Sequence, residues 1–171
     1  MLPRRKSTPA NIRLLILDVD GVLTDGRVYY GARGEQLQSF NIKDGHGLKC
    51  LARAGVAIAI ISGRRSAAVT RRCRDLGIRH VVQGSRDKLR DFRALAAKLA
   101  VTPAQCAYIG DDSPDVALLH EVGLAFAVAD AHPSARAAAH HVTRLGGGCG
   151  AVREVCDRLL AAHSARHGPG H

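Results

Sequence analysis

The chain has 171 residues, 46% of them hydrophobic, which is enough for one domain with a buried core and argues against intrinsic disorder. Its 25 basic and 15 acidic residues give a formal net charge of +10, which favours anionic partners. Nucleic acid is disfavoured among them, because stacking side chains are scarce (three Tyr, three Phe and no Trp) and no nucleic-acid-binding motif occurs.

The two ends of the chain are expected to be flexible tails around one domain of residues 12–163. Residues 1–11 are basic and contain two prolines, and residues 164–171 contain glycine and proline. The apolar run 14–17 is too short for a signal peptide or for the about 18 residues of a membrane span. The five cysteines form no C-x-x-C pair, which fits reduced thiols. We therefore expect a cytoplasmic protein with no membrane partner.

Short apolar runs alternate with amphipathic stretches along the chain. Five runs that end near Gly, Ser or Asp predict strands covered on both faces: 14–18, 56–61, 80–83, 106–109 and 124–128. Five amphipathic stretches predict helices: 47–54, 66–76, 88–99, 114–122 and 151–162. One glycine-bounded turn between 27–30 and 35–40 predicts a β-hairpin. The alternation predicts an α/β fold of three layers around a parallel, Rossmann-like sheet.

The first predicted strand ends in two acids, Asp18 and Asp20, followed by Gly21. Carboxylates two residues apart on an extended chain point to opposite faces, but a glycine allows the chain to turn at once and bring both to one pocket. Two acids directly after a buried strand are costly without a function or a bound metal. The alternative is an acidic loop that caps the following structure.

The second and third predicted strands are followed by groups that bind phosphate. Ser62, Gly63 and Arg64 offer a hydroxyl and free backbone N–H groups just before a helix. Lys88 stands near the start of the helix after the third strand. Each signal has an ordinary alternative, because many loops contain Ser-Gly and a single lysine is usually a surface charge.

The fourth predicted strand is followed by three carboxylates in five residues, Asp111, Asp112 and Asp115. Oxygen ligands of this kind suit Mg²⁺. Capping of the next helix by Asp112 or Ser113 is the alternative, and it accounts for one acid but not for the cluster.

The order Asp-x-Asp, Ser, Lys and Gly-Asp-Asp-x-x-Asp, each after a successive strand, resembles the haloacid-dehalogenase superfamily of phosphotransferases over about residues 14–160. The resemblance implies that Asp18 is a nucleophile that forms an aspartyl-phosphate. It implies that Asp20 is the general acid and base, and that Ser62 and Lys88 bind the phosphoryl oxygens.

The same resemblance implies a Mg²⁺ cofactor. Its ligands would be Asp18, the backbone carbonyl of Asp20, and Asp111. Asp112 and Asp115 would support the metal shell or orient Lys88. The metal and the lysine would offset the repulsion between a carboxylate and a phosphate dianion.

The spaces in which larger members of the superfamily insert a cap domain are short here, so a capless domain with a hairpin flap after the first strand is expected. Several segments together resemble the 3-deoxy-D-manno-octulosonate 8-phosphate phosphatase family, which makes the sugar acid of lipopolysaccharide. They are 24–26, 41–45, 61–64, 110–112, 128–133 and 150–155. The family resemblance implies a homotetramer in which hairpins assemble centrally and neighbouring subunits complete each site.

The family resemblance also implies residues that bind a small substrate with a phosphate at one end and a carboxylate at the other. Besides Asp20 and Lys88, they are Asn41, Ile42, Lys43, Asp44, Gly45, Lys49, Arg64 and Arg72. Two positions depart from the family pattern. Lys49 stands where arginine is expected and lacks the planar fork that suits a carboxylate, and Cys149 stands where relatives usually carry a basic residue.

Three other functions remain open on the sequence alone. A phosphatase for a nine-carbon, sialic-acid-type 9-phosphate would share all the catalytic motifs. A non-catalytic binding subunit would keep the fold, although the intact Asp18, Asp20, Lys88 and Asp111 argue against it. A polynucleotide end phosphatase is suggested only by the net charge.

Overall fold

The central sheet consists of six parallel strands in the order β5-β4-β1-β6-β7-β8, in a computed structural model that describes residues 7–34 and 36–167. The strands are β1 (Leu14–Leu17), β4 (Ala57–Ser62), β5 (His80–Gln83), β6 (Cys106–Gly110), β7 (Leu124–Ala127) and β8 (His141–Val142). All four residues of β1 are fully buried. Continuous apolar strands of this kind require cover on both faces of the sheet.

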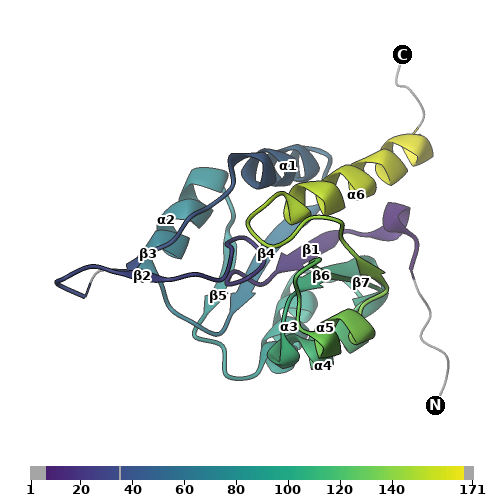
Figure 1. Ribbon diagram of the computed structural model, residues 1–171. Coiled ribbons are helices and arrows are strands. Elements are labelled where there is room, and N and C mark those ends of the chain that lie inside the picture. The colour runs from purple at the N-terminus through teal and green to yellow at the C-terminus, as the bar shows by residue number, and fades with distance from the viewer. Residues whose placement is uncertain (1–6, 35, 168–171) are drawn as a thin grey trace.

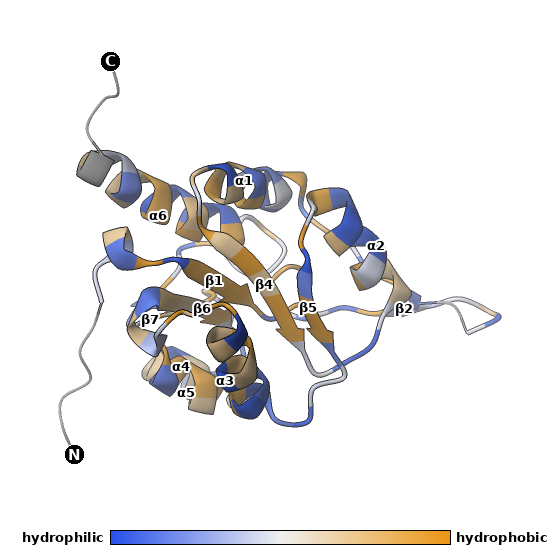
Figure 2. Ribbon diagram, turned by 180° about the vertical axis from the view of Figure 1, so that it is seen from behind, coloured by the Kyte–Doolittle hydropathy of each residue, from blue (hydrophilic) through white to orange (hydrophobic). Residues whose placement is uncertain are grey.

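Helices cover both faces, which confirms the three-layer α/β prediction (Figure 1). One face carries α1 (Ile42–Arg53), α2 (Ala67–Leu76) and α6 (Ala151–His167). The other carries α3 (Lys88–Lys98), α4 (Val116–Glu121) and α5 (Pro133–Ala138). Short 3₁₀ turns lie at Pro9–Asn11, Pro103–Gln105 and Ser113–Asp115. The strands are the most hydrophobic layer, and the helices contain both hydrophobic and hydrophilic residues (Figure 2).

The chain order of the strands creates a crevice beside β1. From β1 the chain builds β4 and β5 on one side, and then crosses to build β6, β7 and β8 on the other. Ligands of open parallel sheets bind at such a reversal, outside the carboxyl ends of the strands. The residues that follow β1 and β6 therefore occupy the position where a ligand is expected.

Three elements on the body of the domain show the clearest differences from the sequence-based expectation. Helix α1 begins at Ile42, five residues earlier than predicted, because Asn41 caps it through a 2.8 Å hydrogen bond from Lys43 N. Two glycines hid this start, and they serve close packing: a Cβ on Gly45 would overlap Arg72. Helix α5 and strand β8 were not predicted, because each is shorter than the window in which periodicity is visible.

Parts of the predicted tails belong to helical elements. Residues 9–11 form a 3₁₀ turn, Ser7 N donates to Gly123 O at 2.8 Å, and His163 Nε2 lies 3.0 Å from Ile12 O. Helix α6 continues to His167 and so includes residues 164–167. The N-terminal turn packs against α6. Residues 1–6 and 168–171 lie outside the described residues.

The predicted hairpin is present, with short strands. β2 (Tyr29–Tyr30) pairs antiparallel with β3 (Gln36–Leu37), and the hairpin projects from the body of the domain (Figure 1). Tyr29, Tyr30 and Leu37 are 52%, 68% and 62% exposed. No helix in the described part of the chain is both long and apolar enough to cross a membrane.

Candidate active site

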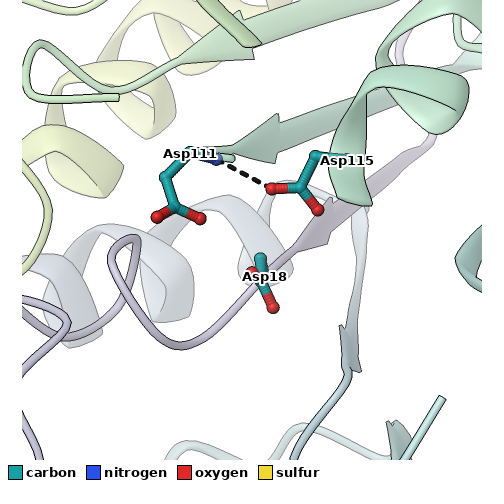
Figure 3. A group of neighbouring side chains, drawn as sticks. All are labelled: Asp18, Asp111 and Asp115. Carbon is teal, nitrogen blue, oxygen red and sulfur yellow. Dashed lines mark hydrogen bonds between the residues drawn. The ribbon is translucent and has the colours of Figure 1, made fainter. Parts of the chain in front are cut away.

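Three carboxylates meet at the carboxyl end of the sheet, where β1 and β6 lie side by side. Asp18 follows β1 directly, Asp111 follows β6, and Asp115 reaches back from the start of α4 (Figure 3). One carboxylate oxygen from each lies within 4.8 Å of the others. The convergence that the sequence predicted for separate strand ends is therefore present in the fold.

Asp115 is fully buried and holds the cluster together. Its Oδ2 accepts hydrogen bonds from the backbone N–H groups of Asp111 (2.9 Å) and Asp112 (3.1 Å). Its Oδ1 accepts from Lys88 Nζ and from the Tyr108 hydroxyl, both at 2.6 Å. Four donors use the acceptor capacity of this carboxylate. Asp115 therefore organises this cluster through its hydrogen bonds.

Lys88, the first residue of α3, bridges two of the acids. Its Nζ lies 3.0 Å from Asp18 Oδ2 and 2.6 Å from Asp115 Oδ1, and its side chain is 9% exposed. Burial alone would lower the pKa of Lys88, but the two carboxylates outweigh burial and raise the pKa above its usual value. The ammonium group therefore remains charged beside Asp18.

The cluster carries more negative charge than Lys88 neutralises. Burial is the main cause that raises the pKa of Asp18 to about 6 and that of Asp111 to about 8, and neighbouring carboxylates add to both shifts. Such a site favours a cation, and hard carboxylate oxygens suit Mg²⁺. Asp18 and Asp111 fit the role of its ligands.

The loop after β1 brings the backbone of residues 20–21 to the same place. The backbone N–H groups of Val22, Leu23 and Thr24 all donate to Val19 O, so the chain turns tightly after the strand. Gly21 has φ +83°, and a Cβ there would overlap the Asp111 carboxylate. The close approach requires glycine and sets this stretch of backbone, which contains the carbonyl predicted to bind Mg²⁺, beside Asp111.

Asp20 contacts Gln38, which follows the hairpin, and Arg64, in the loop before α2. Gln38 Nε2 donates to Asp20 Oδ1 at 2.7 Å, and Arg64 Nε lies 3.9 Å from Asp20 Oδ2. A pocket of about 370 Å³ opens above the cluster. Ten residues line it: Asp18, Asp20, Gly26, Gly63, Arg64, Lys88, Asp111, Asp112, Pro114 and Asp115. Acids, a buried lysine and an arginine around one small pocket suit the transfer of a phosphoryl group.

Comparisons with known proteins agree with this chemistry. Residues 76–146 match the family model of haloacid dehalogenase-like hydrolases. The 3-deoxy-D-manno-octulosonate 8-phosphate phosphatase of Yersinia pestis is 52% identical over 159 residues, 93% of this chain and 85% of the relative. The phosphatase of the same name from Escherichia coli K12 is 53% identical over 152 residues, 89% of this chain and 81% of the relative. This chain belongs to the 3-deoxy-D-manno-octulosonate 8-phosphate phosphatase family.

One solved structure of the same family was determined with bound ligands. The Moraxella catarrhalis phosphatase, in complex with a magnesium ion, a phosphate ion and a KDO molecule, has a TM-score of 0.89 and 41% identity to this chain. The match covers 93% of each chain. The cofactor of this family is Mg²⁺, in agreement with the carboxylate cluster at Asp18 and Asp111.

Of the residues predicted for phosphoryl transfer, Asp18, Asp20 and Lys88 line the pocket, and Ser62 is the exception. Ser62 ends β4 and is 2% exposed, and its hydroxyl accepts a 3.4 Å hydrogen bond from Arg64 N. It does not line the pocket in this structure. Asp112 caps the 3₁₀ turn Ser113–Asp115 through a 2.6 Å hydrogen bond from Ser113 N to its Oδ1. The capping alternative therefore holds for this one acid.

Of the predicted substrate-binding residues outside the catalytic set, only Arg64 lines the pocket within a single chain. Asp44 is 1% exposed and its Oδ1 accepts from Arg153 N at 2.8 Å, so it caps α6 where a substrate contact was predicted. Arg72 Nη2 donates to Asn41 O at 3.1 Å, and Asn41 Nδ2 donates to Gly148 O at 3.2 Å. These side chains tie helices and loops together.

The remaining positions of this set are solvent-facing or backbone positions on α1. Ile42 is 81% exposed, Lys43 and Lys49 are exposed, and Gly45 is buried in the first turn. None of them lines the pocket of its own chain. Their contact with substrate stays a prediction, in which these residues reach the pocket of a neighbouring subunit.

Two residues of the site were not predicted. Tyr108 lies inside β6 and donates to Asp115, but in the sequence it is one more apolar position of a buried strand. Gln38 follows β3 and donates to Asp20. No local sequence pattern predicts either contact, because the two residues of each pair lie on different elements.

Proposed function

We propose that this protein is a Mg²⁺-dependent phosphatase that hydrolyses 3-deoxy-D-manno-octulosonate 8-phosphate to 3-deoxy-D-manno-octulosonate and phosphate. The observation that supports this proposal most directly is the buried Lys88 ammonium, which lies between Asp18 and Asp115 and beside Asp111. The chain also belongs to this phosphatase family. In this proposal the reaction takes place in the cytoplasm and supplies the sugar acid of lipopolysaccharide.

The reaction would proceed in two steps at Asp18. A carboxylate oxygen of Asp18 attacks phosphorus, the bond to the sugar oxygen breaks, and Asp20 gives that oxygen its proton. Water then attacks the phosphorus of the aspartyl-phosphate while Asp20 accepts a proton from that water, and the bond between phosphorus and the Asp18 oxygen breaks to release phosphate. Lys88 holds Asp18 in position and neutralises phosphoryl charge, with Arg64 at the pocket edge. Bound Mg²⁺ supplies further charge neutralisation on the phosphoryl oxygens.

Asp18 and Asp111 would hold the metal, together with the carbonyl of Asp20. Asp115 is left as the positioning group for Lys88, because its oxygens already accept four hydrogen bonds. Asp112 would support the shell from its capping position.

The proposal includes a homotetramer. A pocket of about 370 Å³ without a cap domain is open to water, and closing an active site strengthens its electrostatics. The exposed Tyr29, Tyr30 and Leu37 offer an apolar hairpin surface for assembly, and the exposed start of α1 would reach a neighbour's site. Light scattering tests this part, and a monomer with full activity would contradict it.

A panel of purified phosphate esters tests the substrate. We expect kcat/KM for the octulosonate 8-phosphate to exceed that for nonulosonate 9-phosphates and nucleotides by about 10²-fold or more, because contacts to the carboxylate end contribute only with the correct sugar. A higher kcat/KM for the nonulosonate ester would overturn the substrate assignment but would still agree with a phosphatase. Absence of phosphate release from every ester would overturn the enzyme assignment.

A further inference from the structure

Gln38 links the hairpin to the proposed acid/base, Asp20. Gln38, directly after β3, donates from Nε2 to Asp20 Oδ1 at 2.7 Å. The two residues are 18 positions apart, and the chain brings them together where it returns from the hairpin. The Asp20 side chain is 23% exposed, so the contact lies at the pocket mouth and not in the core.

The Gln38 amide is held in one orientation by α2. Its Oε1 accepts a 2.6 Å hydrogen bond from the Ser66 hydroxyl. Ser66 is the N-cap of α2, and its Oγ accepts from Val69 N at 3.4 Å, so its proton is free to point at Gln38. Because an ionised carboxylate only accepts hydrogen bonds, the NH₂ end of the amide faces Asp20, and the carbonyl end is left to accept from the Ser66 hydroxyl.

Ser66 is itself held in place by a second amide. Gln83 at the end of β5 accepts from Ser66 N at 2.8 Å, and its NH₂ donates to Thr70 Oγ1 at 2.8 Å. The chain of contacts therefore runs from the sheet edge through Ser66 and Gln38 to one oxygen of Asp20. The other oxygen, Oδ2, faces Arg64 Nε at 3.9 Å.

We infer that Gln38 is a positioning residue for Asp20: it anchors one carboxylate oxygen so that the other is presented to the leaving oxygen and to the hydrolytic water. This inference rests on the proposed function. General acid–base catalysis requires the transferring oxygen within hydrogen-bond reach of the reacting atom, and a carboxylate free to rotate spends less time there. The hairpin segment thereby acts on the chemical step although its described residues do not line the pocket.

The test uses two substrates that differ in their need for an acid. The octulosonate 8-phosphate releases an alkoxide that must be protonated, whereas 2,4-dinitrophenyl phosphate releases a stable phenolate. The value of kcat/KM reports the steps up to departure of the leaving group. In the full-length Gln38→Met variant with Mg²⁺, we expect kcat/KM to fall about tenfold for the sugar phosphate, part of the full 10²–10⁴-fold contribution of a general acid, and less than about twofold for the aryl phosphate.

Two further variants bracket the result. Asp20→Asn should show the same split with a larger loss. Ser66→Ala, which removes the hydroxyl that orients the amide, should show the same split with a smaller loss.

Gln36→Met is the matched control. Gln36, on β3, accepts at Oε1 from Arg64 Nη2 at 3.0 Å, and among the described residues it makes no hydrogen bond to Asp20. Because Arg64 Nε lies 3.9 Å from Asp20 Oδ2, beyond hydrogen-bond distance, we expect the difference between the two substrates to be smaller in this variant than in Gln38→Met.

Equal losses for the two substrates in Gln38→Met, or no loss, would overturn the inference. Thermal midpoints and light scattering of each variant separate a folding or assembly defect from a positioning defect, and Gln38→Asn, which keeps the amide, should recover part of the sugar-phosphate activity. If wild-type protein hydrolyses the aryl phosphate and other primary alkyl phosphates but not the octulosonate ester, the proposed substrate fails, and the same split is then measured on the alkyl ester that it does hydrolyse.

Discussion

Two regions were expected to contact substrate: the strand ends at β1 and β6, and the start of α1. They differ in burial and in their position relative to the pocket. At the strand ends, Asp18, Lys88 and Asp115 are buried within one chain and make short mutual contacts. At the start of α1, Ile42 is 81% exposed and Lys49 is exposed, and neither lines the pocket.

The difference separates two tasks. Groups that act on the phosphoryl centre must be preorganised at distances near 3 Å, and burial inside one chain achieves this. Groups that select the sugar need only meet the far end of the substrate, and they can come from another subunit. Variants of the two regions should therefore fail in different ways.

Loss of the nucleophile should have the largest effect. We expect Asp18→Asn to lower phosphate release by at least about 10⁴-fold, because an amide cannot form the covalent intermediate. Its thermal midpoint should not fall, since the substitution removes a buried charge whose pKa burial raises to about 6, and Lys88 keeps Asp115. Asp75→Asn, at an exposed position of α2, is the control. Equal turnover in the two variants would refute the assignment.

Removal of Lys88 should damage both activity and stability. Lys88→Met leaves two buried carboxylates without their cation, which should lower the free energy of unfolding by about 3–5 kcal/mol. Activity should fall about 10²–10³-fold. Urea unfolding and phosphate release measure the two effects. Lys98→Met, at the exposed end of the same helix, should change neither, and a similar stability loss there would show that the site is not the cause.

Magnesium should stabilise the protein more at higher pH. The pKa values of Asp18 (about 6) and Asp111 (about 8) lie above the unfolded value of 3.8, so these groups bind more protons in the folded state. Their contribution to the stability of the metal-free protein is present below about pH 4 and is lost as pH rises through 6 and 8. Metal binding has the opposite trend, because it requires the deprotonated carboxylates.

Thermal midpoints with Mg²⁺ and with a chelator measure this linkage. The stabilisation by Mg²⁺ should be small at about pH 5.5 and reach about 2.7 kcal/mol at 100 times Kd near pH 8.5. The Asp111→Asn variant should lose most of it. A shift that is independent of pH in the wild type would argue against these two carboxylates as the metal ligands.

The smallest effect is expected at the start of α1. Lys49→Arg restores the planar fork that suits a carboxylate, and should raise kcat/KM for the octulosonate ester about 2–10-fold. Turnover of p-nitrophenyl phosphate, which has no carboxylate, is the internal control. An equal change for both esters would place Lys49 among the groups that act on the phosphoryl end and would weaken the division between the two regions.

Much of the fold was visible in the sequence because buried parallel strands are continuous apolar runs. The strand β5 was predicted at its observed bounds, and β1 and β7 each end one residue earlier than predicted. The start of α1 was missed because Gly45 and Gly47 weaken the helical signal, and only the packing against α2 and α6 shows why glycine is needed. The order of the strands in the sheet was not predicted, since it depends on which face each crossover helix takes.

The sequence by itself determined the chemistry-bearing groups and the edge of the sheet at which they stand, because residue type and the two periodicities are local properties. Only the tertiary structure decided what each group does there. The family resemblance left Asp115 either to support the metal shell or to orient Lys88, and the structure places its carboxylate on Lys88 across 27 residues. Gln38 meets Asp20 across 18 residues, and Asp44 caps α6. Such roles follow from which donors the packed helices and the hairpin bring within hydrogen-bond distance of each carboxylate, and that distance is a property of the folded chain alone.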